Sequence, residues 1–346
     1  MQVLRGAGAT GLEPATSGVT GRRSNRLSYA PNGTASMPTP RGQGGRPYIA
    51  AVSSRPAVDV VLPFRGSDEA LERVAQRLGG LELRRGDSVT LADNRPGAVG
   101  GWRGSVRILA AQGRRTSYFA RNQGVAVGAA PWIVFLDADV HAPANLLDRY
   151  FARPPGDEVG VLAGAVIDEA PPDDGTASAA ERYAWLKSSM SQEVTLAHGS
   201  YAFAQTANAA VRRVALERAG GFEPGVRSGG DADMCFRVRA AGWALERREE
   251  AAVTHRNRAT IPRMLAQRAR HGAGAAWLGR RWPGALPRRS WPGLAWWSVR
   301  RTAAGVLAAA RGDRDGALLG LLDGPAVWAF ELGRLIPNRP RPRLRR

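Results

Sequence analysis

Short apolar runs and amphipathic segments alternate through the first half of the ordered part of the chain. The runs are rich in branched and aromatic residues, which is typical of strands buried on both faces of a sheet. They lie at residues 58–63, 88–92, 106–110 and 132–136. Between them, residues 67–78 and 117–127 carry the composition and apolar spacing of helices. This alternation predicts an α/β domain whose parallel sheet has right-handed crossovers.

The pattern is less regular after residue 140. It predicts a loop at 96–104, helices at 144–151, 177–194 and 211–219, and strands at 159–167, 201–205 and near 244–246. From residue 261 the chain reads as helical pieces broken by Pro and Gly. Six tryptophans are concentrated there: Trp277, Trp282, Trp291, Trp296, Trp297 and Trp328.

The apolar run at 132–136 ends in two aspartates, Asp137 and Asp139, separated by one residue. Ligands of open α/β sheets bind at the carboxyl ends of the strands. Two crowded carboxylates repel each other unless a cation lies nearby, and Mg²⁺ prefers carboxylates together with ligand phosphates. The pattern therefore favours a metal–phosphate site. The alternative is that Asp137 caps a turn and Asp139 is a solvated loop carboxylate.

Composition divides the 346 residues into three segments. Residues 1–55 are rich in Gly, Ser, Thr, Pro and Arg, and we predict that they are disordered. Within them, residues 11–31 resemble a peptide produced when a tRNA gene is translated, which would place the true start at Met37. Residues 56–260 form the predicted α/β domain, and residues 261–346 form a helical extension rich in Trp and Arg.

The formal net charge of +19 comes almost entirely from arginine, because Lys187 is the only lysine. The arginines are spread along the chain, so we expect an anionic nucleotide-sugar or anionic lipid as partner and no nucleic acid. With Cys235 as the single cysteine, an intrachain disulfide is excluded, which fits a reducing compartment. The N-terminus lacks a signal sequence, and no segment is apolar enough to span a bilayer.

These features predict a cytoplasmic protein, with peripheral attachment to the inner face of the cell membrane as a hypothesis. Tryptophans beside an arginine-rich tail suit the headgroup region of a bilayer. The alternative is that the tryptophans fill an ordinary helical subdomain and that the tail is solvated.

Motifs between about residues 58 and 280 occur in the order of one known family. They are Val58–Phe64, Ala92-Asp93-Asn94, Ala120-Arg121-Asn122-Gln123-Gly124, Phe135-Leu136-Asp137-Ala138-Asp139, and a block comprising Asn208–Arg213, Gly220-Gly221-Phe222 and Asp231–Arg237. The chain thereby resembles glycosyltransferase family 2, the inverting nucleotide-sugar transferases with a GT-A fold. The resemblance implies a mostly parallel, Rossmann-like central sheet flanked by helices, with the C-terminal helices as an extension.

The resemblance also implies the residues of the nucleotide pocket. Pro63 and Phe64 would form its wall, and Asp93 would hydrogen-bond the nucleobase. Asp137 would lie near the ribose, and Arg121 would support the pocket.

The resemblance further implies a metal site and a base. Asp139, helped by His255, would hold Mg²⁺ or Mn²⁺ on the donor diphosphate, and Asp231 matches the catalytic base. Gly230 departs from the family, which commonly has Glu there, so how the acceptor is held stays open. The alternative interpretations are that Asp231 caps a helix and that His255 is a buried histidine at the end of a strand. We expect Cys235 to lie in the core.

The implied function is inverting sugar transfer from a nucleotide-diphosphate sugar to a lipid-linked or polysaccharide acceptor, in cell-surface polysaccharide or glycolipid synthesis. One alternative is a nucleotidyltransferase, although residues 62–66 are not the Gly-rich basic loop that such an enzyme would carry. The other alternative is a non-catalytic, transferase-like scaffold at a membrane assembly.

Overall fold

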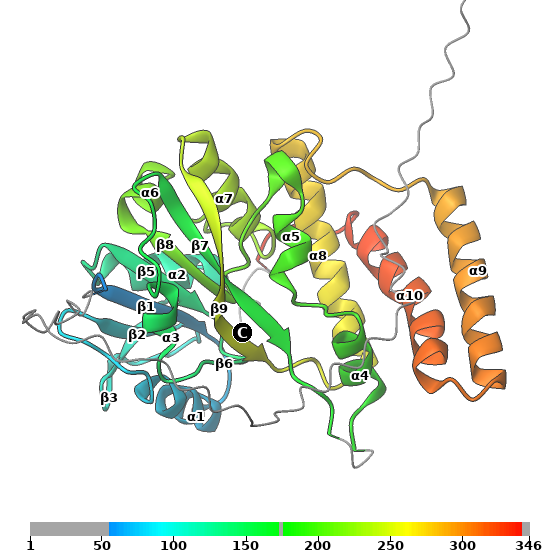
Figure 1. Cartoon of the computed structure of the whole chain (residues 1–346), viewed down its shortest axis with the longest axis horizontal. Coiled ribbons are helices and arrows are strands. Elements are labelled where there is room, and N and C mark those ends of the chain that lie inside the picture. The colour runs from blue at the N-terminus through cyan, green and yellow to red at the C-terminus, as the bar shows by residue number, and fades with distance from the viewer. Residues whose placement is uncertain (1–54, 173–175, 341–346) are drawn as a thin grey trace, which may run out of the picture. The chain divides into compact units, whose positions relative to one another are not determined.

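In the computed structural model, which describes residues 55–172 and 176–340, the strands of the described part form one nine-stranded sheet (Figure 1). Its order is β3-β4-β2-β1-β5-β8-β7-β9-β6. The strands are β1 (Val58–Phe64), β2 (Ser88–Asp93), β3 (Gly101–Arg103), β4 (Val106–Ala110), β5 (Trp132–Leu136), β6 (Val140–His141), β7 (Val159–Asp168), β8 (Asn208–Arg212) and β9 (Ala244–His255). The predicted α/β class is confirmed.

The sheet is parallel from β4 through β2 and β1 to β5, and mixed beyond. Strand β8 runs antiparallel to both β5 and β7, so β7 has the direction of β5, and β9 pairs parallel with β7. As a result, β2, β1, β5, β7 and β9 all end at the same edge of the sheet. Residues that follow these five strands are therefore brought to one edge from distant parts of the sequence.

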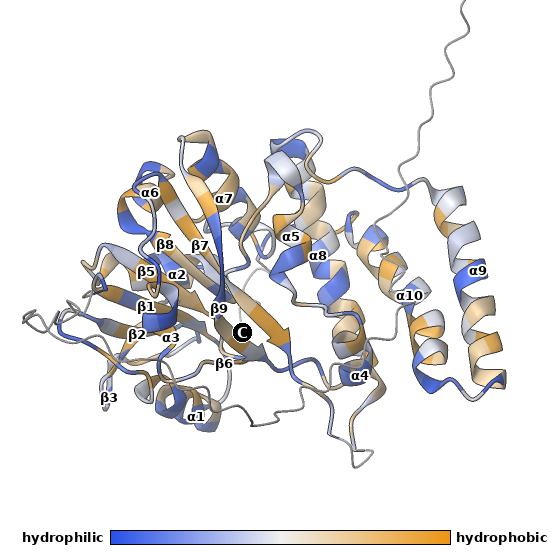
Figure 2. Ribbon diagram, viewed as in Figure 1, coloured by the Kyte–Doolittle hydropathy of each residue, from blue (hydrophilic) through white to orange (hydrophobic). Residues whose placement is uncertain are grey.

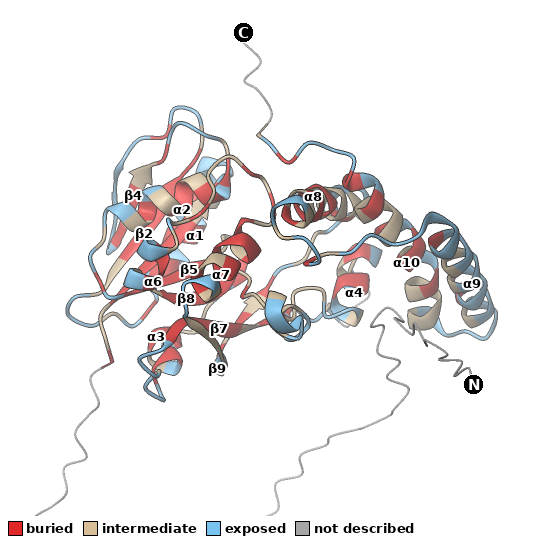
Figure 3. Ribbon diagram, turned by 90° about the horizontal axis from the view of Figure 1, so that it is seen from above, coloured by how far each residue is buried: buried red, intermediate tan, exposed pale blue. Residues whose placement is uncertain are grey.

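Two cores cover the two faces of the sheet, and β5 contributes to both. Trp132, Val134 and Leu136 pack with α1 (Asp68–Gly79) and α3 (Leu146–Tyr150). Ile133 and Phe135 pack with α2 (Ser117–Ala126), α6 (Arg213–Arg218) and α7 (Gly230–Ala240). All five residues of the run are buried. Hydrophobic segments (Figure 2) and buried segments (Figure 3) run through the sheet and the helices against it. The predicted double-sided strand is confirmed.

Several local predictions hold, and others are wrong in position. Ser67 caps α1 as expected, since its side chain accepts a hydrogen bond from the Ala70 amide. The predicted strand at 201–205 is wrong. A short helical turn, η1 (Gly199–Tyr201), ends at Tyr201, residues 202–205 form no helix or strand, and the strand β8 begins at Asn208. The two alanines and two polar ends of β8 give no strong strand signal, and its pairing with β5 and β7 decides its conformation.

Three further elements differ from the sequence predictions. The predicted loop at 96–104 contains the short strand β3, and the predicted helix at 177–194 is two helices, α4 (Ala179–Leu186) and α5 (Gln192–Leu196). Ser188, between them, has a positive φ of 45°, which no α-helix can accommodate. The predicted strand near 244–246 extends to His255 as the single strand β9.

Three long helices follow the sheet: α8 (Ile261–Arg281), α9 (Trp291–Ala310) and α10 (Arg314–Gly333). The expected breaks at Pro and Gly occur between these helices, at Pro283 and Gly284 and at Gly312, whereas Pro262 and Pro292 stand in first turns, where proline is tolerated. Helix α10 packs against both α8 and α9, as Figure 1 shows. No helix of the described residues is long and apolar enough to cross a membrane.

The described residues belong to one compact unit. The division of this unit at residue 260 stays a prediction. The predictions for residues 1–54, including a start at Met37, and those for the arginines of 341–346 concern residues outside the described part of the chain.

Candidate active site at the carboxyl edge of the sheet

The predicted site residues follow strands that end at the same edge of the sheet. Pro63 and Phe64 end β1, and Asp93 ends β2, directly opposite Phe64 in the strand register. Asp137 and Asp139 follow β5, and His255 ends β9. Arg121 and Asp231 are added by helices α2 and α7. The fold thus brings all eight predicted residues to this edge.

Arg121 connects the first aspartate of the pair to an aromatic cluster. The buried guanidinium donates to Asp137 Oδ1 through Nη2, and it lies 5.6 Å from the Tyr118 ring centroid and 5.9 Å from that of Phe222. The Tyr118 and Phe222 rings stack at 5.8 Å. Next to Arg121, the Asn122 side chain bonds both the amide and the carbonyl of Phe222. Helix α2, which carries Arg121 and Asn122, therefore holds Asp137 and Phe222 in place together.

Asp231 lies in the first turn of α7 but does not cap that helix. The cap is Gly229, whose φ of 81° lies in the left-handed region that favours glycine. Asp231 Oδ1 accepts hydrogen bonds from the Tyr118 hydroxyl, at 3.2 Å, and from the Ala232 amide, at 3.1 Å. The helix-cap interpretation of Asp231 is wrong, and its carboxylate is hydrogen-bonded to Tyr118 of α2.

Tyr118 also gives a physical reason for the glycine at position 230. A Cβ atom on Gly230 would lie 2.8 Å from three atoms of the Tyr118 ring, closer than carbon atoms tolerate. The ring is held by its stacking on Phe222 and by its bond to Asp231, so it cannot easily move aside. The space that a side chain at position 230 would need is therefore occupied by Tyr118.

The environment of Asp231 favours a carboxylate that takes up a proton readily. Burial raises the pKa of Asp231 above its usual value, and the charge of Asp137 acts in the same direction. The Arg121 charge and backbone hydrogen bonds partly oppose this. A carboxylate with a raised pKa is a stronger base than one in water, which suits the abstraction of a proton from a hydroxyl group.

A second group surrounds Asp139. Its carboxylate lies 3.6 Å from His255 Nε2 and 3.2 Å from an Arg258 nitrogen. Burial alone would raise the pKa of Asp139, but His255 and Arg258 hold it below its usual value. Burial alone would lower the pKa of His255, but the carboxylates of Asp139 and Asp168 raise it to about 9.

The donor set of this second group fits two protein ligands of a divalent cation. Asp139 offers oxygen and His255 offers Nε2, while His255 Nδ1 lies 3.8 Å from Asp168 Oδ1, and both of these buried atoms lack a hydrogen-bond partner. A carboxylate behind a histidine is a common way to orient a metal-ligating ring. In the described part of the chain no three His, Cys, Asp or Glu side chains are grouped to hold a metal, so further ligands would have to come from a bound diphosphate and water.

Asp93 is engaged by a neighbour that the sequence analysis did not name. Arg95 binds both carboxylate oxygens of Asp93 at 2.7–3.0 Å and also binds Asp68. Its guanidinium lies 5.5 Å from the Phe64 ring centroid. Asp93 itself is nearly fully buried. The arginine thus covers Phe64 and fixes Asp93, at the place where the nucleobase was predicted.

Sequence reasoning missed Tyr118, Asp168, Arg95 and Arg258. Two of them carried a usable signal: Tyr118 precedes Arg121 by three residues on one helix face, and Asp168 ends a predicted strand, as Asp93 does. The contacts of Arg95 and Arg258 depend on side-chain directions that no periodicity predicts.

Known proteins resemble this chain in sequence and fold. The family model described as glycosyl transferase family group 2 matches residues 132–312, which is more than half of the chain. The pre-mycofactocin glycosyltransferases of two Mycobacterium tuberculosis strains, CDC 1551 / Oshkosh and H37Rv, are 26% identical over 230 residues. That match covers 65% of this chain and 48% of each relative, so the chain spans about half the length of these curated relatives.

Among solved structures, a mannosyltransferase from Pyrobaculum calidifontis in complex with GDP-Man and Mn²⁺ aligns with a TM-score of 0.47 at 18% identity, covering 82% of this chain and 83% of its own. A mycobacterial protein aligns with a TM-score of 0.44 at 16% identity, covering 67% and 76%. The breadth of the family match, which includes β5 with its two aspartates, α7 and β9, identifies the chain: it belongs to the glycosyl transferase family group 2.

Proposed function

We propose that this protein is an inverting glycosyltransferase that moves a sugar from a nucleotide-diphosphate sugar to a hydroxyl group of an acceptor. One observation carries the proposal. The Asp231 carboxylate, with its raised pKa, is linked through Tyr118 and Arg121 to Asp137, at the sheet edge that also bears Asp139. A base on one side and a cation or diphosphate position on the other are the two requirements of in-line transfer.

Five residues would receive the nucleotide. Pro63 and Phe64 end β1 and would form the wall of the pocket, with Asp93 toward the nucleobase. Arg95 would control this contact, because Asp93 has to share its oxygens with that arginine. Asp137 would lie near the ribose, held in place by Arg121.

Asp139 and His255 would hold Mg²⁺ or Mn²⁺ at the donor diphosphate. When bound, the ion would neutralise the negative charge that grows on the leaving diphosphate. Asp168 would keep the His255 ring oriented with Nε2 toward Asp139. Arg258, which lies 3.2 Å from Asp139, would supply a fixed positive charge next to the metal position.

Asp231 would act as the base. The acceptor hydroxyl would give its proton to a carboxylate oxygen of Asp231 while its own oxygen forms a bond to the anomeric carbon. The bond from that carbon to the diphosphate breaks on the opposite face, so one displacement inverts the configuration. Tyr118 would orient the carboxylate through its hydroxyl, and Arg121 and Asp137 would set the charge around it.

The acceptor we propose is a lipid-linked or polysaccharide intermediate of cell-surface polysaccharide or glycolipid synthesis. The corresponding location is the cytoplasm, at the inner face of the cell membrane. Basic residues and tryptophans gathered in the C-terminal helices support an acceptor presented at an anionic surface.

A thermal-shift panel tests the donor site. Residues 37–346 are mixed with UDP-, GDP- and dTDP-sugars, each with Mn²⁺ and with EDTA. A ligand that binds only the folded state raises the melting temperature by mass action. We expect a rise with one nucleotide class that EDTA abolishes. If no sugar nucleotide raises the melting temperature in Mn²⁺, the donor site as described here is wrong, and a non-catalytic scaffold becomes the better account.

Two substitutions separate the base from the metal site. Asp231→Asn should abolish transfer and leave metal-dependent donor binding intact, whereas Asp139→Ala should weaken donor binding itself. Asp157→Asn, at an exposed loop position, is the matched control for the loss of a carboxylate. Near-full turnover by Asp231→Asn would refute the assignment of the base.

A further inference from the structure

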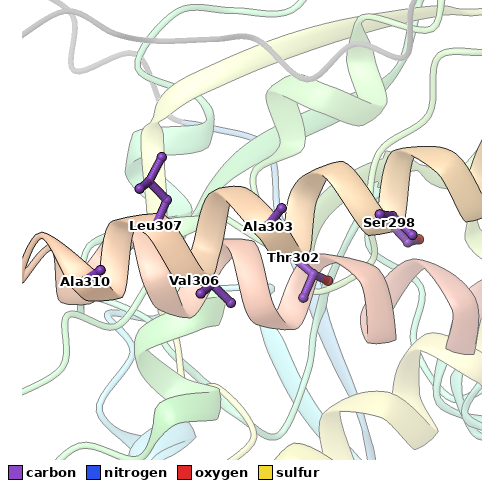
Figure 4. Close-up of a pocket in the computed structure, with 7 residues that line it drawn as sticks. Ser298, Thr302, Ala303, Val306, Leu307 and Ala310 are labelled. Atoms are coloured by element: carbon purple, nitrogen blue, oxygen red, sulfur yellow. The ribbon is translucent and has the colours of Figure 1, made fainter.

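Helix α9 presents an apolar side to solvent over most of its length. Trp296, Val299, Ala303, Val306 and Leu307 recur at helical spacing and form one stripe, which we call the α9 face. Trp296 is 65% exposed and Val299 is 62% exposed. Figure 4 shows Ala303, Val306 and Leu307 among the side chains of a shallow groove of about 730 Å³ on this helix.

The packing of α9 explains why these side chains remain outside. Only Leu294 and Gly305 of α9 are buried. Gly305 meets Gly320 of α10 so closely that a Cβ on Gly305 would lie 2.9 Å from the Gly320 backbone. The two helices therefore touch backbone to backbone at this point, and the large side chains of α9 are left to point elsewhere. A surface helix in water normally turns polar residues outward, so this face is unusual for a free surface.

The charged side chains of α9 and of the segments that flank it are mostly arginines. Residues 288–314 contain six arginines, and Asp313 is their only acidic residue. Asp313 caps α10 by accepting a hydrogen bond from the Gly316 amide at 2.9 Å. Arg301 pairs with Asp323 of α10, whereas Arg300 is exposed within α9, and Arg311 and Arg314 are exposed just beyond its end. The apolar stripe is thus accompanied by arginines along its length and at its end.

The apolar stripe and its arginines together distinguish between two partners that could cover the α9 face: a second copy of the chain and an anionic bilayer. A second copy of the helix would bring Arg300 near another Arg300, and α9 carries no acidic side chain to pair with either. An anionic bilayer surface offers phosphates to the arginines and an acyl boundary to the tryptophan and aliphatic side chains. Since no helix of the described residues can span a bilayer, α9 would lie in the plane of the surface.

We propose that the α9 face docks the protein onto anionic phospholipid. The proposal stands on the exposure and charge of α9 and does not require the catalytic assignment. If both hold, α9 would keep the enzyme at the surface where a lipid-linked acceptor is presented.

Vesicle flotation with the full chain tests the proposal. The vesicles are phosphatidylcholine alone, or phosphatidylcholine and phosphatidylglycerol in equal parts. We expect binding to the anionic vesicles, weaker binding to the neutral ones, and release by high salt. The variant Val299→Glu/Leu307→Glu should lower the affinity for anionic vesicles at least about tenfold, because two charges would enter the acyl boundary. It keeps every arginine, including those of the tail.

Val99→Glu is the control for a glutamate introduced at an exposed apolar position, because Val99 is 80% exposed on a loop remote in sequence from α9. It should float as the wild type does, and all three proteins should keep the same circular dichroism spectrum. Metal-dependent nucleotide binding, measured in parallel, should be equal in the three proteins, so failure of the donor site would be visible separately.

Three results would overturn the proposal. The double variant could float as well as the wild type, which would assign binding to other arginines. The wild type could fail to float and self-associate through contacts that the double variant loses, which would make the α9 face an interface between copies. Finally, the wild type could neither float nor self-associate.

Discussion

Removing the hydroxyl group of Tyr118 should make Asp231 harder to ionise. In Tyr118→Phe the carboxylate loses the donor at 3.2 Å and keeps the Ala232 amide at 3.1 Å. A hydrogen bond to the charged form favours that form, so its loss raises a pKa that burial has already raised. The ring itself remains, with its stacking on Phe222.

The size of the effect follows from the length of the bond. A hydrogen bond to a charged group contributes about 1.5–3 kcal/mol, and the long contact to Tyr118 suggests the lower end. Since one pKa unit corresponds to about 1.4 kcal/mol, the pKa of Asp231 should rise by about one unit. The base is active when deprotonated, so the rate should fall on the acid side and recover at higher pH.

The assay is the pH dependence of kcat/KM for sugar transfer. We expect the rising acid limb of Tyr118→Phe to move upward by about one pH unit, with a plateau close to that of the wild type. Tyr183→Phe is the matched control, because the buried Tyr183 hydroxyl donates to Asp323 at 2.8 Å, in the contact between α4 and α10. That variant should leave the acid limb in place.

Two outcomes would contradict this reasoning. An unchanged acid limb in an active Tyr118→Phe variant would show that the hydroxyl does not act on the base. An equal fall in rate at every pH would indicate damage to the structure, and a lowered melting temperature of Tyr118→Phe itself would show that damage.

Two further predictions concern packing and acid stability. Gly230→Ala should lower the free energy of unfolding by about 1–3 kcal/mol in chemical denaturation, because its Cβ would overlap the Tyr118 ring. Gly101→Ala is the control and should have little effect, because a Cβ at Gly101 meets nothing within 4 Å. Equal stability of the two variants would refute the overlap. Burial and nearby arginines lower the pKa of His271 to about 3, below its unfolded value near 6.5, so the stability that it contributes is present above pH 6.5 and is lost as the pH falls toward 3. His271→Gln should therefore make the melting temperature less sensitive to acid over that range, and an unchanged slope would argue against a neutral, partly buried His271.

The motifs of the strand ends could be predicted from the sequence because each is local. An apolar run that ends in a carboxylate describes both a buried strand and the residue that the strand presents at its end, as for β2 with Asp93 and β5 with Asp137. The same local logic gave the Ser67 cap and the core position of Cys235. The class of fold and the edge at which the predicted residues gather followed from these patterns.

Only the tertiary structure decided which residues complete the site and which surface stays uncovered. The contacts of Tyr118 with Asp231 and of Asp168 with His255 join residues more than 80 positions apart, and the antiparallel β8 depends on partners on both sides. The exposure of α9 depends on a glycine contact with α10. Hydrophobic periodicity records which side of an element is buried, but it does not record which element buries it, and chemistry that requires two side chains to meet depends on the second fact.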